Sequence, residues 1–259
     1  MSDNGLGDLD ALFQSAQDDG LTGDSLDLVI SNLNSPTMTG SVGIPLNQLA
    51  SNDVTLAMNI IDMSGSMHSY AHDLILAYND DYLAAMAGSA AADDILVSTI
   101  LFDTNVKLFH GYVNLLDAPP LTRRIYDPDG GTSLYDAVAN GLTNMVLYAQ
   151  QLRQSGVMVR CIVILYSDGD DNSSKQTAAA VRRAAQDLLR HEMYALAYVG
   201  FHNGGIDEAQ LRQLADTIGF PDILPAGLSH EELRRIFHLA SASTMRVSQG
   251  MTQGARLFS

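Results

Sequence analysis

From residue 54 onward, largely apolar runs of eight or nine residues alternate with longer segments of helical period. The runs that we expect to be buried strands are 54–62, 94–102, 160–167 and 193–201, with a shorter one at 222–226. A strand that is buried on both faces has no polar alternation, and such strands are typical of parallel sheets covered by helices. The alternation therefore predicts an α/β fold, a doubly wound and mainly parallel sheet with helices on both faces.

Helices are predicted between these runs, at 67–90, 133–156, 173–191, 207–219 and 229–240. In the first of them we expect Leu74, Ile75, Tyr78 and Met86 to pack against the sheet. Ser133 is a candidate N-cap for the second, because a small hydroxyl residue precedes its first apolar position. Residues 105–112 are short and alternate in polarity, which is typical of an edge strand.

The first 50 residues differ from the rest in being rich in Asp, Gly, Ser and Asn. We divide the chain into an acidic N-terminal arm (1–50), a main domain (51–242) and a C-terminal tail (243–259). Within the arm, 6–16 has the spacing of a short amphipathic helix, with Leu6 among its apolar positions, whereas 26–33 and 40–49 are each expected to be a strand or a loop. Residues 26–33 are too apolar for a solvated linker. We therefore expect them to fold back on the domain, while the first 25 residues stay mobile or dock on a basic partner.

Charge excludes several classes of partner. The net charge is −16, and no Lys or Arg precedes Lys107. Such a chain repels nucleic acid and anionic lipid, and it suits cations or basic protein surfaces; the plainer interpretation is solubility alone. Neither a run of 18 apolar residues nor a basic and apolar leader is present, so we expect no membrane span and no secretory signal. The single Cys161 excludes an internal disulfide, and a cytoplasmic location is the default expectation.

Small oxygen-bearing side chains lie in three of the predicted loops. Asp62, Ser64 and Ser66 end the first apolar run, Thr132 precedes the helix at 133, and Asp168 follows the run at 160–167. Because the carboxyl ends of parallel strands gather at one edge of a sheet, we expect these loops to meet. Carboxylates and hydroxyls are hard ligands that Mg²⁺ prefers. Taken alone, Ser64 and Ser66 are better explained as caps of the next helix, and it is their combination with Thr132 and Asp168 that favours a metal site.

Together these motifs resemble a known family. D-x-S-x-S at 62–66, G-G-T at 130–132 and S-D-G at 167–169 resemble the von Willebrand factor A domain family, with the likeness running from about 54 to 240. The resemblance implies a metal-ion-dependent adhesion site for Mg²⁺ or Mn²⁺. Ser64 and Ser66 would bind through their hydroxyls, and Asp62, Thr132 and Asp168 directly or through water. S-D-G replaces the commoner T-D-G, and "DMSGSM" and "GGTSL" are most similar to the intracellular bacterial branch.

The resemblance implies a binding module rather than an enzyme. An Asp or Glu of a protein partner would complete the metal shell, and relatives of this kind sometimes work alongside an AAA+ ATPase. One alternative is a Mg²⁺-dependent hydrolase or phosphoryl-transfer enzyme. Against it, the sequence has no D-x-D nucleophile and no glycine-lysine phosphate loop. A second alternative is a structural assembly subunit whose metal is incidental, which deletion of the arm would distinguish.

Overall fold

The computed structural model describes residues 9–18, 20–33, 43–169, 171–202, 205–250 and 257–258. Within them, six strands form one sheet in the order β3-β2-β1-β4-β5-β6, and every neighbouring pair is parallel except β2 and β3. This confirms the predicted doubly wound sheet and the edge position of β3. The strands are β1 (Asp53–Asp62), β2 (Ile95–Phe102), β3 (Val106–Asn114), β4 (Met158–Ser167), β5 (Tyr194–Phe201) and β6 (Asp222–Ala226).

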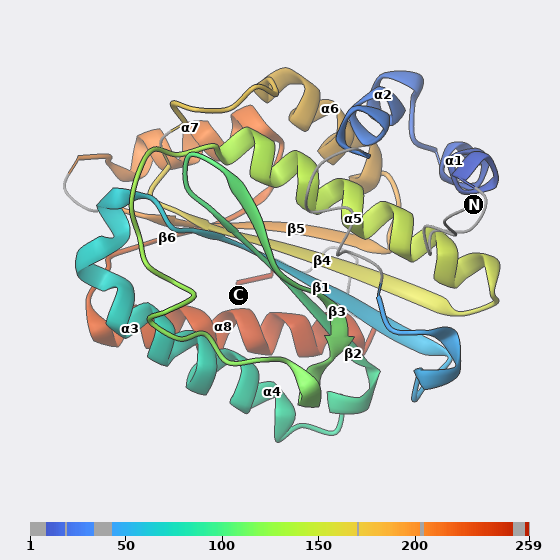
Figure 1. Cartoon of the computed structure of the whole chain (residues 1–259), viewed down its shortest axis with the longest axis horizontal. Coiled ribbons are helices and arrows are strands. Elements are labelled where there is room, and N and C mark those ends of the chain that lie inside the picture. Colours follow the sequence, from blue (N-terminus) through green and yellow to red (C-terminus); the bar gives the residue numbers. More distant parts are fainter. Residues whose placement is uncertain are drawn as a thin grey trace.

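Helices cover both faces of the sheet, as Figure 1 shows. The helices α5, α6 and α7 lie on one face with α1 and α2 outside them, and α3, α4 and α8 lie on the other. Alternate residues of β1 contribute to two separate cores, Met58 and Ile60 to the first and Ala57 and Ile61 to the second. Burial on both faces explains why the strand is largely apolar and shows no polar alternation. The helices are α1 (Leu9–Asp18), α2 (Gly23–Asn32), α3 (Ala71–Leu76), α4 (Ala84–Ala87), α5 (Leu134–Gln154), α6 (Ala178–Leu189), α7 (Glu208–Ile218) and α8 (His230–Ser248).

The connection from β1 to β2 is less regular than the single helix predicted at 67–90. It runs through a 3₁₀ segment (Gly65–Tyr70), α3, a π-helical segment (Ala77–Leu83) and α4. Leu74, Tyr78 and Met86 are fully buried against the sheet as expected, and Ile75 is half-buried beside them. The apolar period indicates a helical segment, but it does not separate an α-helical turn from the wider π-helical one.

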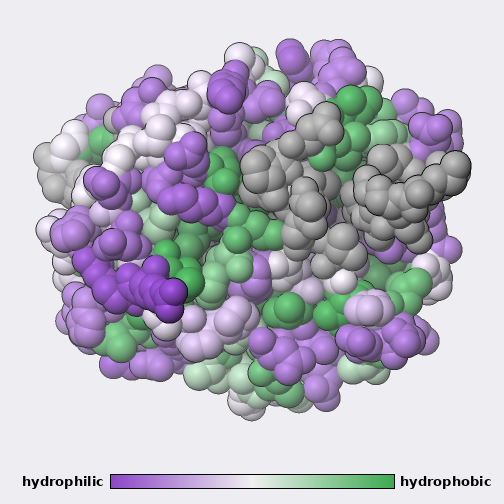
Figure 2. Space-filling model, in the orientation of Figure 1, coloured by the Kyte–Doolittle hydropathy of each residue, from purple (hydrophilic) through white to green (hydrophobic). Residues whose placement is uncertain are grey.

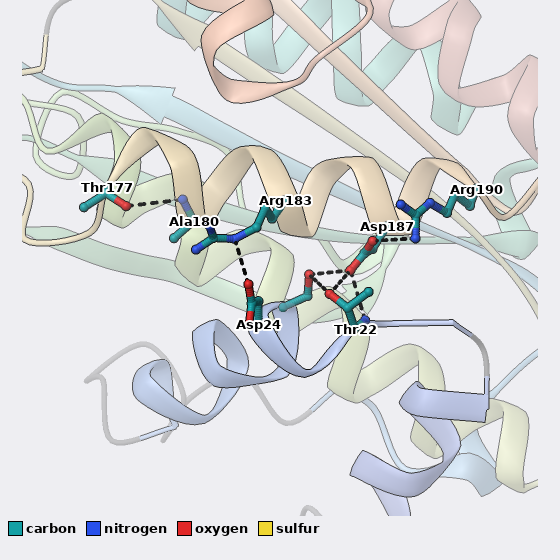
Figure 3. Close-up of polar contacts among 8 residues, drawn as sticks. Thr22, Asp24, Thr177, Ala180, Arg183, Asp187 and Arg190 are labelled. Carbon is teal, nitrogen blue, oxygen red and sulfur yellow. Dashed lines mark hydrogen bonds and ion pairs between the residues drawn. The ribbon is translucent and has the colours of Figure 1, made fainter.

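The arm folds back on the domain, but as helices. The segment 26–33, for which we expected a strand or a loop, lies mainly in α2; that expectation was wrong because a short apolar run fits either period. Leu28 and Val29 are buried against α5 and α6, whereas Ile30 is 48% exposed. An exposed ion pair between Asp24 and Arg183 also joins α2 to α6 (Figure 3).

The first 25 residues do not stay mobile throughout, because α1 also packs on α5. The Ser15 hydroxyl donates to Gln150 Oε1 at 2.6 Å, and Gln154 Nε2 donates to the Ala11 carbonyl at 3.1 Å. Leu6 lies outside the described residues, as do residues 34–42. Within 40–49 the described part forms a 3₁₀ turn, Leu46–Gln48, rather than a strand.

The boundary that we placed between domain and tail at residue 242 falls inside α8, which continues to Ser248. Ser243, Thr244 and Val247 are buried, and the first two donate their hydroxyls to helix carbonyls four residues earlier. Because these bonds satisfy the hydroxyls within the helix, this polar stretch can be buried without leaving its hydroxyls unpaired.

Polar residues dominate the face shown in Figure 2, with smaller apolar groups between them. None of the helices in the described part of the chain is long and apolar enough to cross a membrane.

Candidate functional site

The five predicted site residues come together where β1 and β4 lie side by side. These are the strands from which the chain winds outward in opposite directions, and ligands of such sheets bind beyond the carboxyl ends at this point. Asp62 ends β1, and Asp168 follows β4. A hollow of about 570 Å³ lies at this edge. Its lining consists of Ser64, Gly65, Ser66, Gly130, Thr132, Asp168, Asn172, Gly205, Ile206 and Gln210.

The two serines face each other rather than capping a helix. Their Oγ atoms are 3.1 Å apart, and both residues line the hollow. Ser64 occupies the N-cap position of the 3₁₀ segment Gly65–Tyr70, yet its side chain makes no capping hydrogen bond. The capping alternative is therefore wrong for Ser64, and its hydroxyl is placed at the edge of the hollow instead.

Asp62 lies beneath the hollow and is fully buried. Its Oδ1 accepts the Ser64 N–H at 2.8 Å, and its Oδ2 accepts the Ser167 hydroxyl at 2.5 Å. Burial, and then the negative charge of Asp168, raise the pKa of Asp62 to about 7 despite these bonds. Two carboxylates that share a site in this way repel each other, and a bound cation would offset that cost.

Backbone contacts hold the first two loops together. The Gly65 N–H donates to the Gly130 carbonyl at 3.1 Å, and the Asp129 N–H donates to the Met63 carbonyl at 3.1 Å. Gly130 has a φ of +76°, and a Cβ there would lie 2.8 Å from Thr104 Oγ1. A glycine is therefore required at position 130. The turn that it allows lies between the loop of the two serines and Thr132.

Sequence reasoning missed three residues that support the site. The Ser167 hydroxyl binds Asp62, the Tyr126 hydroxyl donates to the Asp62 carbonyl at 2.6 Å, and Asn172 Oδ1 accepts the Thr132 N–H at 2.9 Å. Ser167 is the serine of S-D-G, where the family more commonly has threonine. Its position one residue before Asp168 was the available signal, whereas Tyr126 and Asn172 have no recognisable spacing. Asp170, in the same loop, lies outside the described residues.

The donor set fits a hard cation. No group of three or more His, Cys, Asp or Glu gathers for a metal among the residues that the structure describes. The hollow instead offers the hydroxyls of Ser64, Ser66 and Thr132 and the carboxylate of Asp168, with Asp62 below. Oxygen ligands with little negative charge suit Mg²⁺ or Mn²⁺ rather than a soft metal.

Comparison with known proteins identifies the family. The model of the von Willebrand factor type A domain matches residues 58–222, which include all five predicted site residues. The chain belongs to the von Willebrand factor type A domain family. This von Willebrand factor type A domain matches none of the curated proteins that were searched.

Solved structures agree on the fold. The PilB minor pilin from Streptococcus sanguinis is 15% identical, with a TM-score of 0.52 over 83% of this chain and 65% of the pilin. The pilus adhesin SpaC from Lactobacillus rhamnosus GG is 14% identical, with a TM-score of 0.56 over 78% of this chain and 31% of the adhesin. The chain thus spans just under two thirds of the first protein and about a third of the second. At these identities the likeness shows the fold alone, and it does not single out the intracellular bacterial branch.

Proposed function

We propose that this von Willebrand factor type A domain binds a protein partner through a divalent cation, Mg²⁺ or Mn²⁺. The observation that carries the proposal is the meeting of Ser64, Ser66, Thr132 and Asp168 in one hollow at the switch point of the sheet. These four residues would hold the ion. Asp62, whose oxygens accept hydrogen bonds from Ser64 and Ser167, would orient the first loop from below.

The composition of the hollow favours a carboxylate as the partner group. Three of the four proposed ligands are neutral hydroxyls, so a bound divalent ion keeps positive charge and attracts an Asp or Glu side chain. None of the described residues that line the hollow is Lys or Arg, so among them no cationic side chain competes with the ion for a carboxylate. A charge-assisted contact of this kind gives register and selectivity to an interface.

The same lining favours binding over catalysis. A hydrolase needs a base or nucleophile that faces the reacting group. Among the described residues lining the hollow, Asp168 is the one titratable side chain, and the proposal uses it as a ligand. We therefore favour an interaction module over a Mg²⁺-dependent hydrolase.

The wider setting follows from the resemblance of the motifs. We propose that the partner is a protein with an accessible Asp or Glu, in a system that includes an AAA+ ATPase, and that the domain works in the bacterial cytoplasm. The acidic net charge of −16 supports a partner that is neither nucleic acid nor membrane.

Calorimetric titration with Mg²⁺ and with Mn²⁺ tests the cation site. Wild type should bind one ion, and the double variant Asp62→Ala, Asp168→Ala should bind none. Ser66→Ala should weaken binding because it removes a hydroxyl from the hollow, whereas Ser69→Ala, an exposed serine on the same 3₁₀ segment, serves as the matched control. Absence of binding by wild type, or unchanged binding by the double variant, overturns the proposal.

Affinity capture from the native lysate tests the partner. Wild type should retain a protein in Mg²⁺ and release it in EDTA, and the double variant should retain none under either condition. Exchange of candidate Asp and Glu residues of the captured protein to Asn and Gln should then abolish the contact. Capture that is indifferent to both EDTA and the double variant would favour the structural assembly subunit.

A further inference from the structure

The loops that carry Thr132 and Asp168 share hydrogen bonds next to the hollow. The Thr132 N–H donates to Asn172 Oδ1 at 2.9 Å. In return, the N–H groups of Asn172 and Ser173 donate to the Thr132 carbonyl at 3.0 and 3.1 Å. The position of one loop is therefore tied to that of the other.

The N-terminus of α5 is completed by the same neighbouring loop. The first N–H groups of a helix have no partner within the helix, and Ser133 at the N-cap makes no capping bond with its side chain. The Tyr135 N–H donates to Asp171 Oδ1 at 3.3 Å, and the Asp136 N–H donates to Ser174 Oγ at 3.1 Å. Side chains of the β4–α6 loop thus act as the cap of α5.

The side chain of Asp136, in α5, in turn accepts hydrogen bonds from the β4–α6 loop. Its carboxylate, in the first turn of α5, accepts the Gln176 N–H at 2.7 Å and the Lys175 N–H at 3.0 and 3.1 Å. It does not line the hollow. Asp136 therefore fixes the far end of the loop that begins at Asp168, and it does so from a position four residues after Thr132.

We propose that Asp136 is a positioning residue of the cation site. By holding the β4–α6 loop against the start of α5, it keeps Thr132 and Asp168 facing the same point. This inference rests on the proposed function. Residues that orient metal ligands through hydrogen bonds commonly change metal affinity by 10- to 100-fold when they are replaced.

Two variants separate positioning from charge. Asp136→Ala removes the acceptors, whereas Asp136→Asn removes the charge but keeps one acceptor oxygen for the Gln176 N–H. By calorimetry, Asp136→Ala should bind Mg²⁺ about tenfold or more weakly, and Asp136→Asn should stay close to wild type. In the metal-free protein, hydrogen exchange at the amides of Lys175 and Gln176 should be faster in Asp136→Ala than in Asp136→Asn.

Thr177→Ala is the matched control. The Thr177 side chain ends the same loop but caps only its own helix α6, accepting the Ala180 N–H at 3.2 Å (Figure 3). Its replacement should leave the Mg²⁺ affinity unchanged.

Three results overturn the inference alone: wild-type affinity in Asp136→Ala, equal weakening in the Ala and Asn variants, or equal weakening in Thr177→Ala. Failure of wild type to bind Mg²⁺ overturns the proposed function and this inference with it.

Discussion

Asp62 at the end of β1 and Asp187 on α6 are both almost fully buried, at 0% and 3% exposed, but their surroundings differ. Asp62 accepts two hydrogen bonds and lies close to another carboxylate, that of Asp168. Burial, followed by the repulsion from Asp168, raises the pKa of Asp62 to about 7.

Asp187 is surrounded by donors from the arm (Figure 3). Its Oδ2 accepts the Thr22 N–H at 3.0 Å and the hydroxyls of Thr22 and Ser25 at 2.6 Å each, and its Oδ1 pairs with Arg190 at 3.0 Å. Although burial raises its pKa, the bonds from Ser25 and Thr22 and the charge of Arg190 together lower it below the usual value.

The comparison separates a buried carboxylate whose pKa is lowered by donors and a cation from one whose pKa is raised by burial and a second carboxylate. Thr22 is the N-cap residue of α2 and makes no capping bond of its own, so Asp187 caps that helix from α6. A carboxylate at a helix N-terminus is favourable both as an acceptor and as a negative charge. Asp62 instead faces the carboxylate of Asp168, whose negative charge adds to burial in raising the pKa of Asp62, and a bound cation would offset that repulsion.

The largest expected effect comes from Asp187→Ala. It leaves the N–H of Thr22 and the buried hydroxyl of Ser25 without their acceptor, so the free energy of opening α2 should fall by about 3 kcal/mol. Native-state hydrogen exchange across Gly23–Asn32 measures that quantity. Unchanged protection of α2 would mean that its apolar contacts alone hold the arm in place.

Mg²⁺ should stabilise wild type by about 2.7 kcal/mol at a hundred times its dissociation constant. Asp168→Ala should gain nothing from Mg²⁺, and without metal it should be at least as stable as wild type, because the repulsion on Asp62 is removed. Urea denaturation in Mg²⁺ and in EDTA measures both quantities. Equal stabilisation of the variant by Mg²⁺ would contradict the assigned site.

The difference between these two regions also explains what the sequence predicts. Asp62 and Asp168 are predictable because each follows a long apolar run, and the parallel sheet brings the ends of such runs to one edge. Asp187 gives no such signal, since its partners Thr22 and Ser25 are more than 160 positions away. For the same reason the run 26–33 was not recognised as a helix: its packing face is supplied by α5 and α6, which a local pattern does not contain.

A smaller effect is expected from acid. Because the pKa of Asp187 is lower in the folded protein than its unfolded value of about 3.9, its contribution to stability is present above that value. The contribution is lost as the pH falls through the folded pKa. The difference in urea midpoint between wild type and Asp187→Asn should therefore be constant from pH 7 to about 5 and should shrink below about pH 4. A midpoint difference that persists undiminished in acid would show that the charge of Asp187 is not what makes wild type more stable than Asp187→Asn.

The smallest effect is expected from Arg183→Ala, which removes another polar contact between α2 and α6. The Arg183 Nε lies 3.5 Å from Asp24 Oδ2, and the two side chains are 52% and 68% exposed. Exposed pairs of this kind contribute roughly 0–1 kcal/mol, and salt screens them further. Hydrogen exchange across α2 should therefore change little in Arg183→Ala, and the small change should vanish in 1 M salt. This variant is the control for Asp187→Ala, because it removes a contact between the same helices without uncovering a buried donor. If both variants opened α2 equally, the capping role of Asp187 would be wrong.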